Sequence, residues 1–134
     1  SNKKISLINV VGRHGVSSKN IKFHGKIIKN YNLILKADIL IINAGFSAVS
    51  EAYVRVIPSI IIPIKNHAEQ FINAKIFEEL NLGYSANEEN VSKRLNDLIK
   101  NYIKIKENHI LNNQINVGAD AAALFIDNKI NSFL

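Results

Sequence analysis

The sequence predicts an α/β fold, in which helices cover both faces of a parallel β-sheet, and two observations predict it. Short runs rich in Ile, Leu and Val alternate along the chain with stretches whose apolar residues recur every three or four positions. Such alternation of strands and helices is typical of parallel sheets. The runs at 38–43 and 58–64 are also almost entirely apolar, as expected for strands buried on both faces. With 134 residues, 47% of them hydrophobic, the chain is long enough for a single domain with its own core.

The expected elements follow from these periods. In chain order they are strands at 4–11 and 20–25, a helix at 29–37, a strand at 38–43, a helix at 46–56, a strand at 58–64, a helix at 67–81, a short strand at 83–86, and helices at 88–104 and 118–130. The two prolines stand at the ends of the 58–64 run, where no ladder hydrogen bond is lost. The helix at 67–81 is the most clearly amphipathic, and Gly83 follows it where a C-terminal cap is expected. Its predicted apolar stripe is formed by Phe71, Ala74, Phe77 and Leu80. The segment 107–118 is expected to be a connection.

Composition excludes several classes of protein. Cysteine is absent and the four histidines are scattered, so we expect neither disulfides nor a structural metal. No apolar run reaches the roughly 20 residues of a membrane-spanning helix, and the N-terminus does not resemble a signal peptide, so a soluble, cytoplasmic protein is expected. Methionine is absent even at position 1, and we therefore expect an excised or processed fragment. The formal charge of +6 would suit nucleic acid, an anionic membrane surface or a phosphorylated ligand. Solvated helix faces are the alternative, because no block of five like charges occurs.

A candidate anion site follows the strand at 38–43, in the segment "NAGFSAVSEA". In an open parallel sheet, ligands bind beyond the carboxyl ends of the strands, where helix N-termini present free amides. Gly45 would let the backbone turn sharply and approach a diphosphate, which the amides of Phe46 and Ser47 would bind. Glu51 falls on the same helix face as Ser47 and could accept hydrogen bonds from two sugar hydroxyls. The alternative is an ordinary turn in which Ser47 caps the helix and Glu51 is solvated.

The next strand ends in a second polar helix start, "KNHAEQFINA". Glu69 and Gln70 stand in the first turn of the helix, on the same expected edge of the sheet as Gly45. They could hold the hydroxyls of a second sugar. Helix capping explains Glu69 equally well, because the helix dipole favours an acid there, but it explains Gln70 poorly.

Taken together, these motifs resemble a known family. From Asp38 to Gly83 the sequence is similar to the donor-binding C-terminal domain of GT-B glycosyltransferases, of the MurG (family 28) and UDP-glycosyltransferase type. The similarity includes the small residues, glycine, hydroxyl and glutamate after the first strand, the prolines around "SIII", and Gln followed by Asn-Ala. The later "VGADAAALFI" is similar to the closing "GGAD" helix of these families.

The resemblance implies a three-layer Rossmann-like domain, the C-terminal half of a GT-B fold, and assigns roles to individual residues. The diphosphate of a UDP-sugar donor would contact Asn43, Gly45, Phe46 and Ser47, and its ribose would contact Glu51. Glu69 and Gln70 would hold the donor sugar, with His67 beside them, and the backbone near Ile27 would read the base. Two positions depart from the family: Ala48 replaces a frequent Thr or Ser phosphate ligand, and Asn43 replaces a frequent His or Arg.

The resemblance also implies what the chain lacks. The N-terminal acceptor domain and the first strand–helix unit would be missing, so the fragment alone is expected to be inactive. The donor would be a substrate, with no further cofactor and no metal, in keeping with the absence of an Asp-x-Asp pair. Any of the four histidines is a weak candidate for the catalytic base. Two other functions stay open: a UDP-sugar epimerase-like domain, and a basic α/β module that binds nucleic acid.

Overall fold

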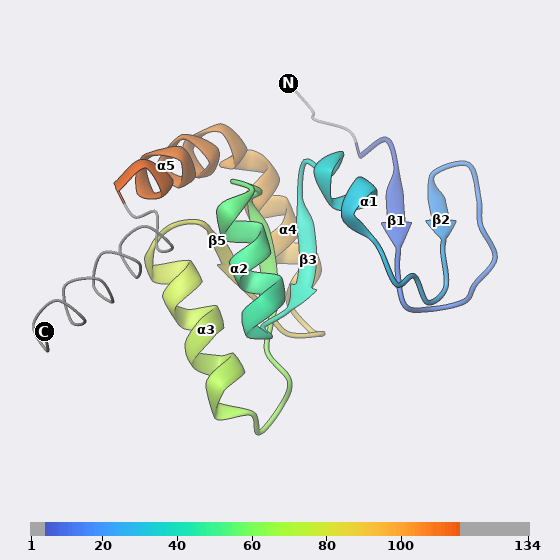
Figure 1. The fold of residues 1–134 in the computed structure, drawn as a ribbon, viewed down its shortest axis with the longest axis horizontal. Helices are drawn as coiled ribbons and strands as arrows, with labels where there is room; N and C mark the ends of the chain where they lie inside the picture. Colours follow the sequence, from blue (N-terminus) through green and yellow to red (C-terminus); the bar gives the residue numbers. More distant parts are fainter. Residues whose placement is uncertain (1–4, 116–134) are drawn as a thin grey trace, which may run out of the picture. The chain divides into compact units, whose positions relative to one another are not determined.

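The computed structural model describes residues 5–115, and the chain divides into two units, Ser1–Asp38 and Ile39–Leu134 (Figure 1). The helix predicted at 118–130 lies outside the described residues. Within the described part, no helix combines the length and the apolar character needed to cross a membrane.

The first unit contains a short parallel ladder followed by a helix. Strands β1 (Ile8–Val10) and β2 (Ile21–Phe23) pair in parallel, with Ile8 opposite Ile21, and α1 (Tyr31–Leu35) follows. Both strands and the helix were expected here. Each is shorter than predicted, because the ladder extends over only three residue pairs and α1 over five residues.

The second unit is built on a three-stranded parallel sheet. Its strands are β3 (Leu40–Asn43), β4 (Ser59–Ile62) and β5 (Gly83–Ser85), in the spatial order β3-β4-β5. In the register, Ile42 of β3 lies opposite Ile61 of β4. The prediction that the apolar runs at 38–43 and 58–64 form neighbouring parallel strands is therefore confirmed.

Helices cover both faces of β4, which makes the unit three-layered. Successive residues of a strand point to opposite faces, so Ile60 and Ile61 begin two separate cores. Ile61 packs with residues of α2 (Phe46–Val54) and α3 (Ala68–Glu79). The members of this first core are Ala44, Ala52, Ile61, Ala74, Phe77 and Leu82. The second core, on the side of α4 (Val91–Lys100) and α5 (Tyr102–Ile115), contains Ile60, Ala86, Leu98 and Ile105.

Strand β3 is less buried than its sequence indicated. β4 is buried through Ser59, Ile60 and Ile61, whereas Ile41 of β3 is 50% exposed. Ile41 lies opposite Ile60 and so shares the face of the second core, where α4 packs on β4 and β5. β3 stands at the edge of this sheet, and the prediction that it is buried on both faces was wrong.

Helix α3 buries a narrower stripe than predicted. Ala74 and Phe77 are buried in the first core, but Phe71 is 62% exposed and Leu80 is 42% exposed. The two exposed residues belong to the terminal turns of the helix rather than to its middle. Only the centre of α3 therefore packs against the sheet.

Gly83 does not cap α3, as the sequence suggested, but begins β5. Asn81, with a φ of 55°, adopts the left-handed conformation after the helix instead. A Cβ at Gly83 would overlap the Ser59 carbonyl of β4 and approach the Phe77 ring to 3.0 Å. Glycine is required at this position because two strands and a helix meet there.

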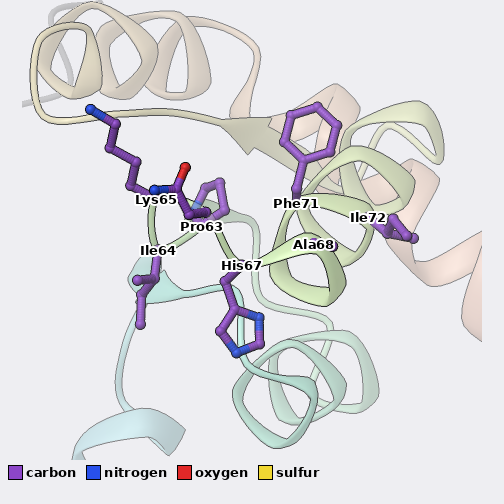
Figure 2. A pocket seen from close by; sticks show the side chains of 8 residues that line it. Pro63, Ile64, Lys65, His67, Ala68, Phe71 and Ile72 are labelled. Carbon is purple, nitrogen blue, oxygen red and sulfur yellow. The ribbon is translucent and has the colours of Figure 1, made fainter.

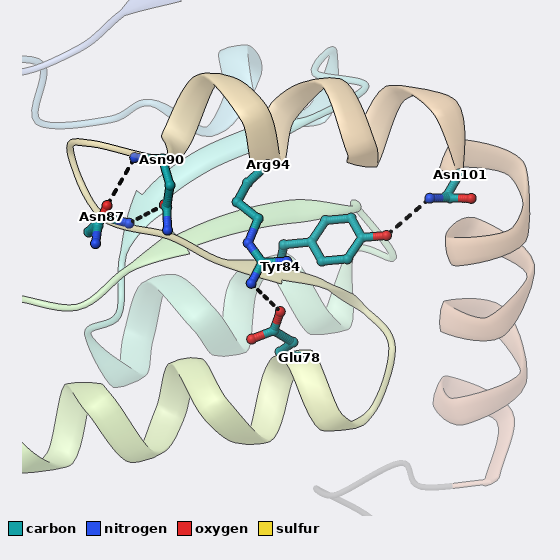
Figure 3. Close-up of polar contacts among 6 residues, drawn as sticks. All are labelled: Glu78, Tyr84, Asn87, Asn90, Arg94 and Asn101. Carbon is teal, nitrogen blue, oxygen red and sulfur yellow. Dashed lines mark hydrogen bonds and ion pairs between the residues drawn. The ribbon is translucent and has the colours of Figure 1, made fainter.

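The C-terminal half of the described chain is more helical than predicted. Instead of one helix at 88–104 and a connection at 107–118, α4 and α5 meet at Asn101. Asn101 Nδ2 donates to the Tyr84 hydroxyl at 3.1 Å (Figure 3). It also donates to the Asp97 carbonyl at 3.0 Å, and the two bonds hold the turn between the helices. The polar, Asn-rich stretch after it is helical because its side chains bind the rest of the unit, and such tertiary contacts override weak helix propensity.

Helix α5 lies at the ends of α2 and α3. Asn108 Nδ2 donates to the carbonyl oxygens of Leu80 at 2.7 Å and of Asn81 at 3.1 Å, just after α3 ends. The Tyr53 hydroxyl, near the end of α2, donates to the Asn112 carbonyl at 3.1 Å. Helices of a parallel α/β unit run back from the carboxyl edge of the sheet, so α5 covers the opposite, amino edge.

Candidate donor site at the carboxyl edge of the sheet

The turn between β3 and α2 combines a buried anchor with an open glycine. Ala44 is fully buried, and its N–H donates to the Ile62 carbonyl of β4 at 3.2 Å. Gly45 is the N-cap of α2. Asn43 stands just before them, exposed at the end of the strand. The turn is thus fixed on its β4 side and open to solvent on the other.

The first amides of helix α2 have no partner among residues 5–115. No side chain in this range caps the helix, and its first backbone bond runs from the Val49 N–H to the Gly45 carbonyl at 3.0 Å. The amides of Phe46, Ser47 and Ala48 therefore have no acceptor within the helix, and they stand at the positive end of its dipole. The Phe46 side chain is 70% exposed. Free amides at a helix start are suited to an anion, and anion binding at this one stays a prediction.

Of the two reasons expected for glycine at position 45, a sharp turn and the close approach of a ligand, the structure contradicts the first. The φ of −65° and ψ of 142° at Gly45 are accessible to any residue, so the turn does not require glycine. A Cβ at this position would meet no heavy atom of the described residues within 4 Å. What glycine leaves here is free space in front of the backbone, at the edge of the sheet where a ligand would approach.

Ser47 and Glu51 do not behave as in an ordinary capped turn. Gly45, rather than Ser47, is the N-cap, and the Ser47 side chain is exposed. Glu51 is half-buried, and its Oε1 accepts a hydrogen bond from Arg55 Nε at 3.0 Å. The structure thus departs from the alternative in which Ser47 caps the helix. A role of Glu51 toward ribose stays a prediction.

The residues predicted to bind the donor sugar lie at the start of α3. Gln70 Oε1 accepts a hydrogen bond from the Ile64 N–H at 3.0 Å. Because a backbone N–H is a donor only, this bond uses the oxygen of the Gln70 amide and not its nitrogen, Nε2. Nε2 has no partner among the described residues. Glu69 is exposed in the first turn of α3. His67 occupies the N-cap position, with its exposed ring making no capping bond.

A shallow hollow adjoins these residues. Its volume is about 630 Å³, and most of its lining is apolar. Figure 2 shows Lys65 and Phe71 on one side of the loop and helix start, and Ile64 and His67 on the other. The lining residues are Pro63, Ile64, Lys65, Asn66, His67, Ala68, Phe71 and Ile72. His67 therefore borders open space next to Glu69.

One residue of this edge was not assigned a role by the sequence. Asn73, one turn beyond Gln70 on α3, donates from Nδ2 to the Ala44 carbonyl at 3.0 Å. This bond joins α3 directly to the turn between β3 and α2. In the sequence, the Asn73–Ala74 pair was the feature that could have indicated this contact. Ala74 is small and buried, which lets α3 approach the turn between β3 and α2 closely.

The remaining predicted residues belong to other elements of the chain. Ile27 belongs to the first unit, in the segment between β2 and α1, and its contact with a base stays a prediction. His14 and His24 also belong to that unit, where His24 Nε2 lies 2.8 Å from Asn9 Oδ1. His109 is fully buried on α5, on the opposite edge of the sheet from Gly45, so it cannot serve as the base at this site. In the described part of the chain, no three His, Asp or Glu side chains are grouped as metal ligands.

Comparison with known proteins gives the family. The glycosyltransferase family 28 C-terminal domain matches residues 2–128, which is nearly the whole chain. The chain belongs to this family. Among solved structures, the family 28 chain is similar to spinosyn forosaminyltransferase SpnP, with a TM-score of 0.60 and 16% sequence identity over 77% of this chain. No curated protein matches the sequence.

The family 28 assignment confirms the resemblance drawn from the sequence motifs. The structural likeness confirms the fold: a Rossmann-like α/β domain similar to part of a GT-B glycosyltransferase. The matched region corresponds to 27% of the length of the SpnP chain. The chain thus spans about a quarter of that relative.

Proposed function

We propose that this family 28 domain binds the nucleotide-sugar donor, a UDP-sugar, of a metal-independent glycosyltransferase of the MurG type. The carboxyl edge of the sheet is the observation that supports the proposal. There the uncapped amides of α2 stand beside an open glycine, and Asn73 joins this turn to the helix that carries Gln70. An uncapped helix start is suited to a diphosphate, and free amide and carboxylate groups are suited to sugar hydroxyls.

The residues would divide the donor among them. The amides of Phe46 and Ser47, with the Ser47 hydroxyl and the Asn43 side chain, would bind the diphosphate, and Glu51 Oε2 would accept from the ribose. Glu69, Gln70 Nε2 and His67 would contact the donor sugar, and the backbone at Ile27 would contact the uracil. During transfer, the bond between the anomeric carbon and the diphosphate oxygen breaks, and the negative charge develops on the leaving diphosphate. Amides at a helix start stabilise such a charge without a metal ion.

The proposal assigns the acceptor and the catalytic base to a further, N-terminal domain. Transfer needs an acceptor hydroxyl in line with the anomeric carbon and a base within about 3 Å of it. In this proposal the described residues supply the donor side of the site. We further propose that the enzyme works in the cytoplasm, where the lysines of this basic chain could hold it at an anionic membrane surface.

Calorimetric titration of the 134-residue chain with UDP tests the proposal. We expect weak, saturable binding of UDP and no transfer of sugar from a UDP-sugar. The control ligand is a single-stranded RNA of mixed sequence. Binding to RNA alone, with an affinity that falls steeply as salt is raised, would instead support the nucleic-acid module. Conversion of a UDP-sugar into its epimer would support the epimerase.

A further inference from the structure

We infer that Asn73 is a positioning residue of the donor site, which orients the peptide between Ala44 and Gly45 so that the Gly45 N–H becomes a donor for the diphosphate. The inference rests on the proposed function, and it adds a residue that the motif comparison left without a role. Asn73 would not touch the donor itself. It would act through the backbone of the neighbouring turn.

The geometry of a trans peptide determines the direction of the Gly45 N–H. Asn73 Nδ2 donates to the Ala44 carbonyl at 3.0 Å, and the described chain contains no cis peptide bond. In a trans peptide the C=O and the following N–H point in opposite directions. A carbonyl held toward α3 therefore turns the Gly45 N–H away from α3. Among the described residues this N–H has no hydrogen-bond partner.

The direction of the Ala44 carbonyl also matters electrostatically, because a free carbonyl oxygen beside the start of α2 would repel an anion bound there. Asn73 occupies that oxygen and holds it on the side of α3, while the Ala44 N–H is held by the Ile62 carbonyl at 3.2 Å. The turn is thereby fixed at both ends of Ala44. The Gly45 amide then adds to the free amides of Phe46 and Ser47, and together they form a row of donors.

Packing explains why the residue is asparagine. Ala74 and Ala44 are both buried in the first core, so the backbones of α3 and of the turn lie close together. The short asparagine side chain reaches the carbonyl across this distance. Aspartate has the same shape but no N–H to donate, and it would place a negative charge beside the anion.

Helix α3 supports both turns of the site in the same way. Gln70 accepts from the Ile64 N–H at 3.0 Å, and Asn73, one turn later, donates to the Ala44 carbonyl. One helix thus fixes the loop after β4 and the turn after β3. The donor sugar and the diphosphate would be held in register, because their contacts are tied to a single rigid element.

The test compares UDP with uridine in NMR titrations of the wild-type chain and the Asn73→Ala variant. Losing one positioned hydrogen bond should weaken UDP binding about tenfold, and uridine binding should stay unchanged because uridine lacks the diphosphate. Asn108→Ala is the matched control, since Asn108 also donates from α5 to a backbone carbonyl, that of Leu80, but at the opposite edge. It should lower the unfolding temperature without changing the ratio of the two affinities.

The NMR spectrum of the wild-type chain tests whether the Gly45 N–H contacts the diphosphate, and this test does not require any variant to fold. On saturation with UDP, the Gly45 amide resonance should shift strongly, as expected for an N–H that gains a charged acceptor. If wild-type chain binds UDP and this resonance does not move, the inference is wrong. An Asn73→Ala variant with an unchanged ratio of UDP to uridine affinity would also overturn it. Absence of UDP binding by the wild type would overturn the proposed function as well.

Discussion

Glu51 and Arg55 form an ion pair one helical turn apart on α2, with Arg55 Nε 3.0 Å from Glu51 Oε1. The two side chains are 35% and 23% exposed, respectively. The bond occupies one carboxylate oxygen of Glu51 and holds the side chain in place. The other oxygen keeps its lone pairs, so a preoriented acceptor stands on the helix face of Ser47.

Replacing Glu51 by alanine should weaken UDP binding by about 1 to 3 kcal/mol, the range for hydrogen bonds to a charged group. The unfolding temperature should change little, because ion pairs at this helical spacing contribute about 0.3–0.5 kcal/mol. Calorimetry and thermal unfolding measure the two effects. Glu79→Ala, which removes the acid of the Lys75–Glu79 pair on α3, is the control and should leave UDP affinity unaltered. Unchanged affinity in the Glu51 variant would remove this residue from the site, and a large loss of stability would give it a structural role.

Replacing Gly45 by alanine should separate binding from folding. The backbone angles suit alanine and no atom lies within 4 Å of the new Cβ, so stability should stay equal or rise by about 0.4–1 kcal/mol, through the lower entropy of the unfolded chain. The methyl group should occupy the space of the diphosphate and weaken UDP binding about tenfold, or about 1.4 kcal/mol. Thermal unfolding and calorimetry on the same sample measure both.

Gly83→Ala provides the contrast for this experiment. Its Cβ would overlap the Ser59 carbonyl, so the variant should unfold at a clearly lower temperature. A Gly45 variant that loses stability to a similar degree would show that glycine is needed there for the turn rather than for a ligand.

The contacts of Arg94 with Glu78 and Tyr84, here called the polar clamp, give a third prediction. Arg94 of α4 reaches Glu78 of α3 at 3.4 Å and lies over the Tyr84 ring of β5, 5.5 Å from its centre (Figure 3). Arg94→Ala removes the ion pair and the cation–π contact, and should cost about 1 kcal/mol of unfolding free energy. Chemical denaturation measures this loss. Lys75→Ala, which breaks a 3.9 Å pair between largely exposed side chains, should cost close to nothing. Equal losses in the two variants would contradict the clamp.

The buried His109 predicts how stability depends on pH. Its ring packs against Tyr53 and Phe77, and neither ring nitrogen has a partner among the described residues. Burial, and to a lesser extent the positive charge of Lys106, lowers the pKa of His109 from 6.5 to about 4. The unfolded chain therefore binds this proton at higher pH than the folded chain. Stability should fall as the pH drops from about 6.5 to about 4, by up to about 3 kcal/mol, and should be unaffected by this group above that range.

His109→Phe is the variant that checks this effect. Denaturation at several pH values should show the wild type losing stability relative to the variant only as the solution is acidified. His67→Asn, which alters an exposed ring at the other edge, should keep the wild-type profile. A constant difference between wild type and His109→Phe across this range would show that burial does not shift the pKa of His109, and would contradict the prediction.

The sequence predicted those features that depend on local pattern, and missed those that depend on which element stands next to which. The apolar runs at β3 and β4 were sufficient to predict that these strands are parallel neighbours, whereas the donor site after β3 stays a prediction. Exposure of Ile41 could not be predicted, because it depends on the edge position of β3. The helical state of the segment around Asn108 depends on its bonds to the end of α3. The role of Asn73 likewise required the position of the Ala44 carbonyl, which is distant in sequence.

The strand order of the second unit has a consequence for how the chain folds during synthesis. β3, β4 and β5 lie side by side in the order in which they are translated, so each strand joins a partner that is already made. Such vectorial growth needs no later segment to insert between earlier ones, and each step closes only one strand–helix–strand loop. Until β5 arrives, however, a nascent chain carries β4, with its consecutive isoleucines Ile60, Ile61 and Ile62, as an open edge. Translational pausing before residue 83 would expose that edge to other chains, and self-association of such intermediates is the expected hazard.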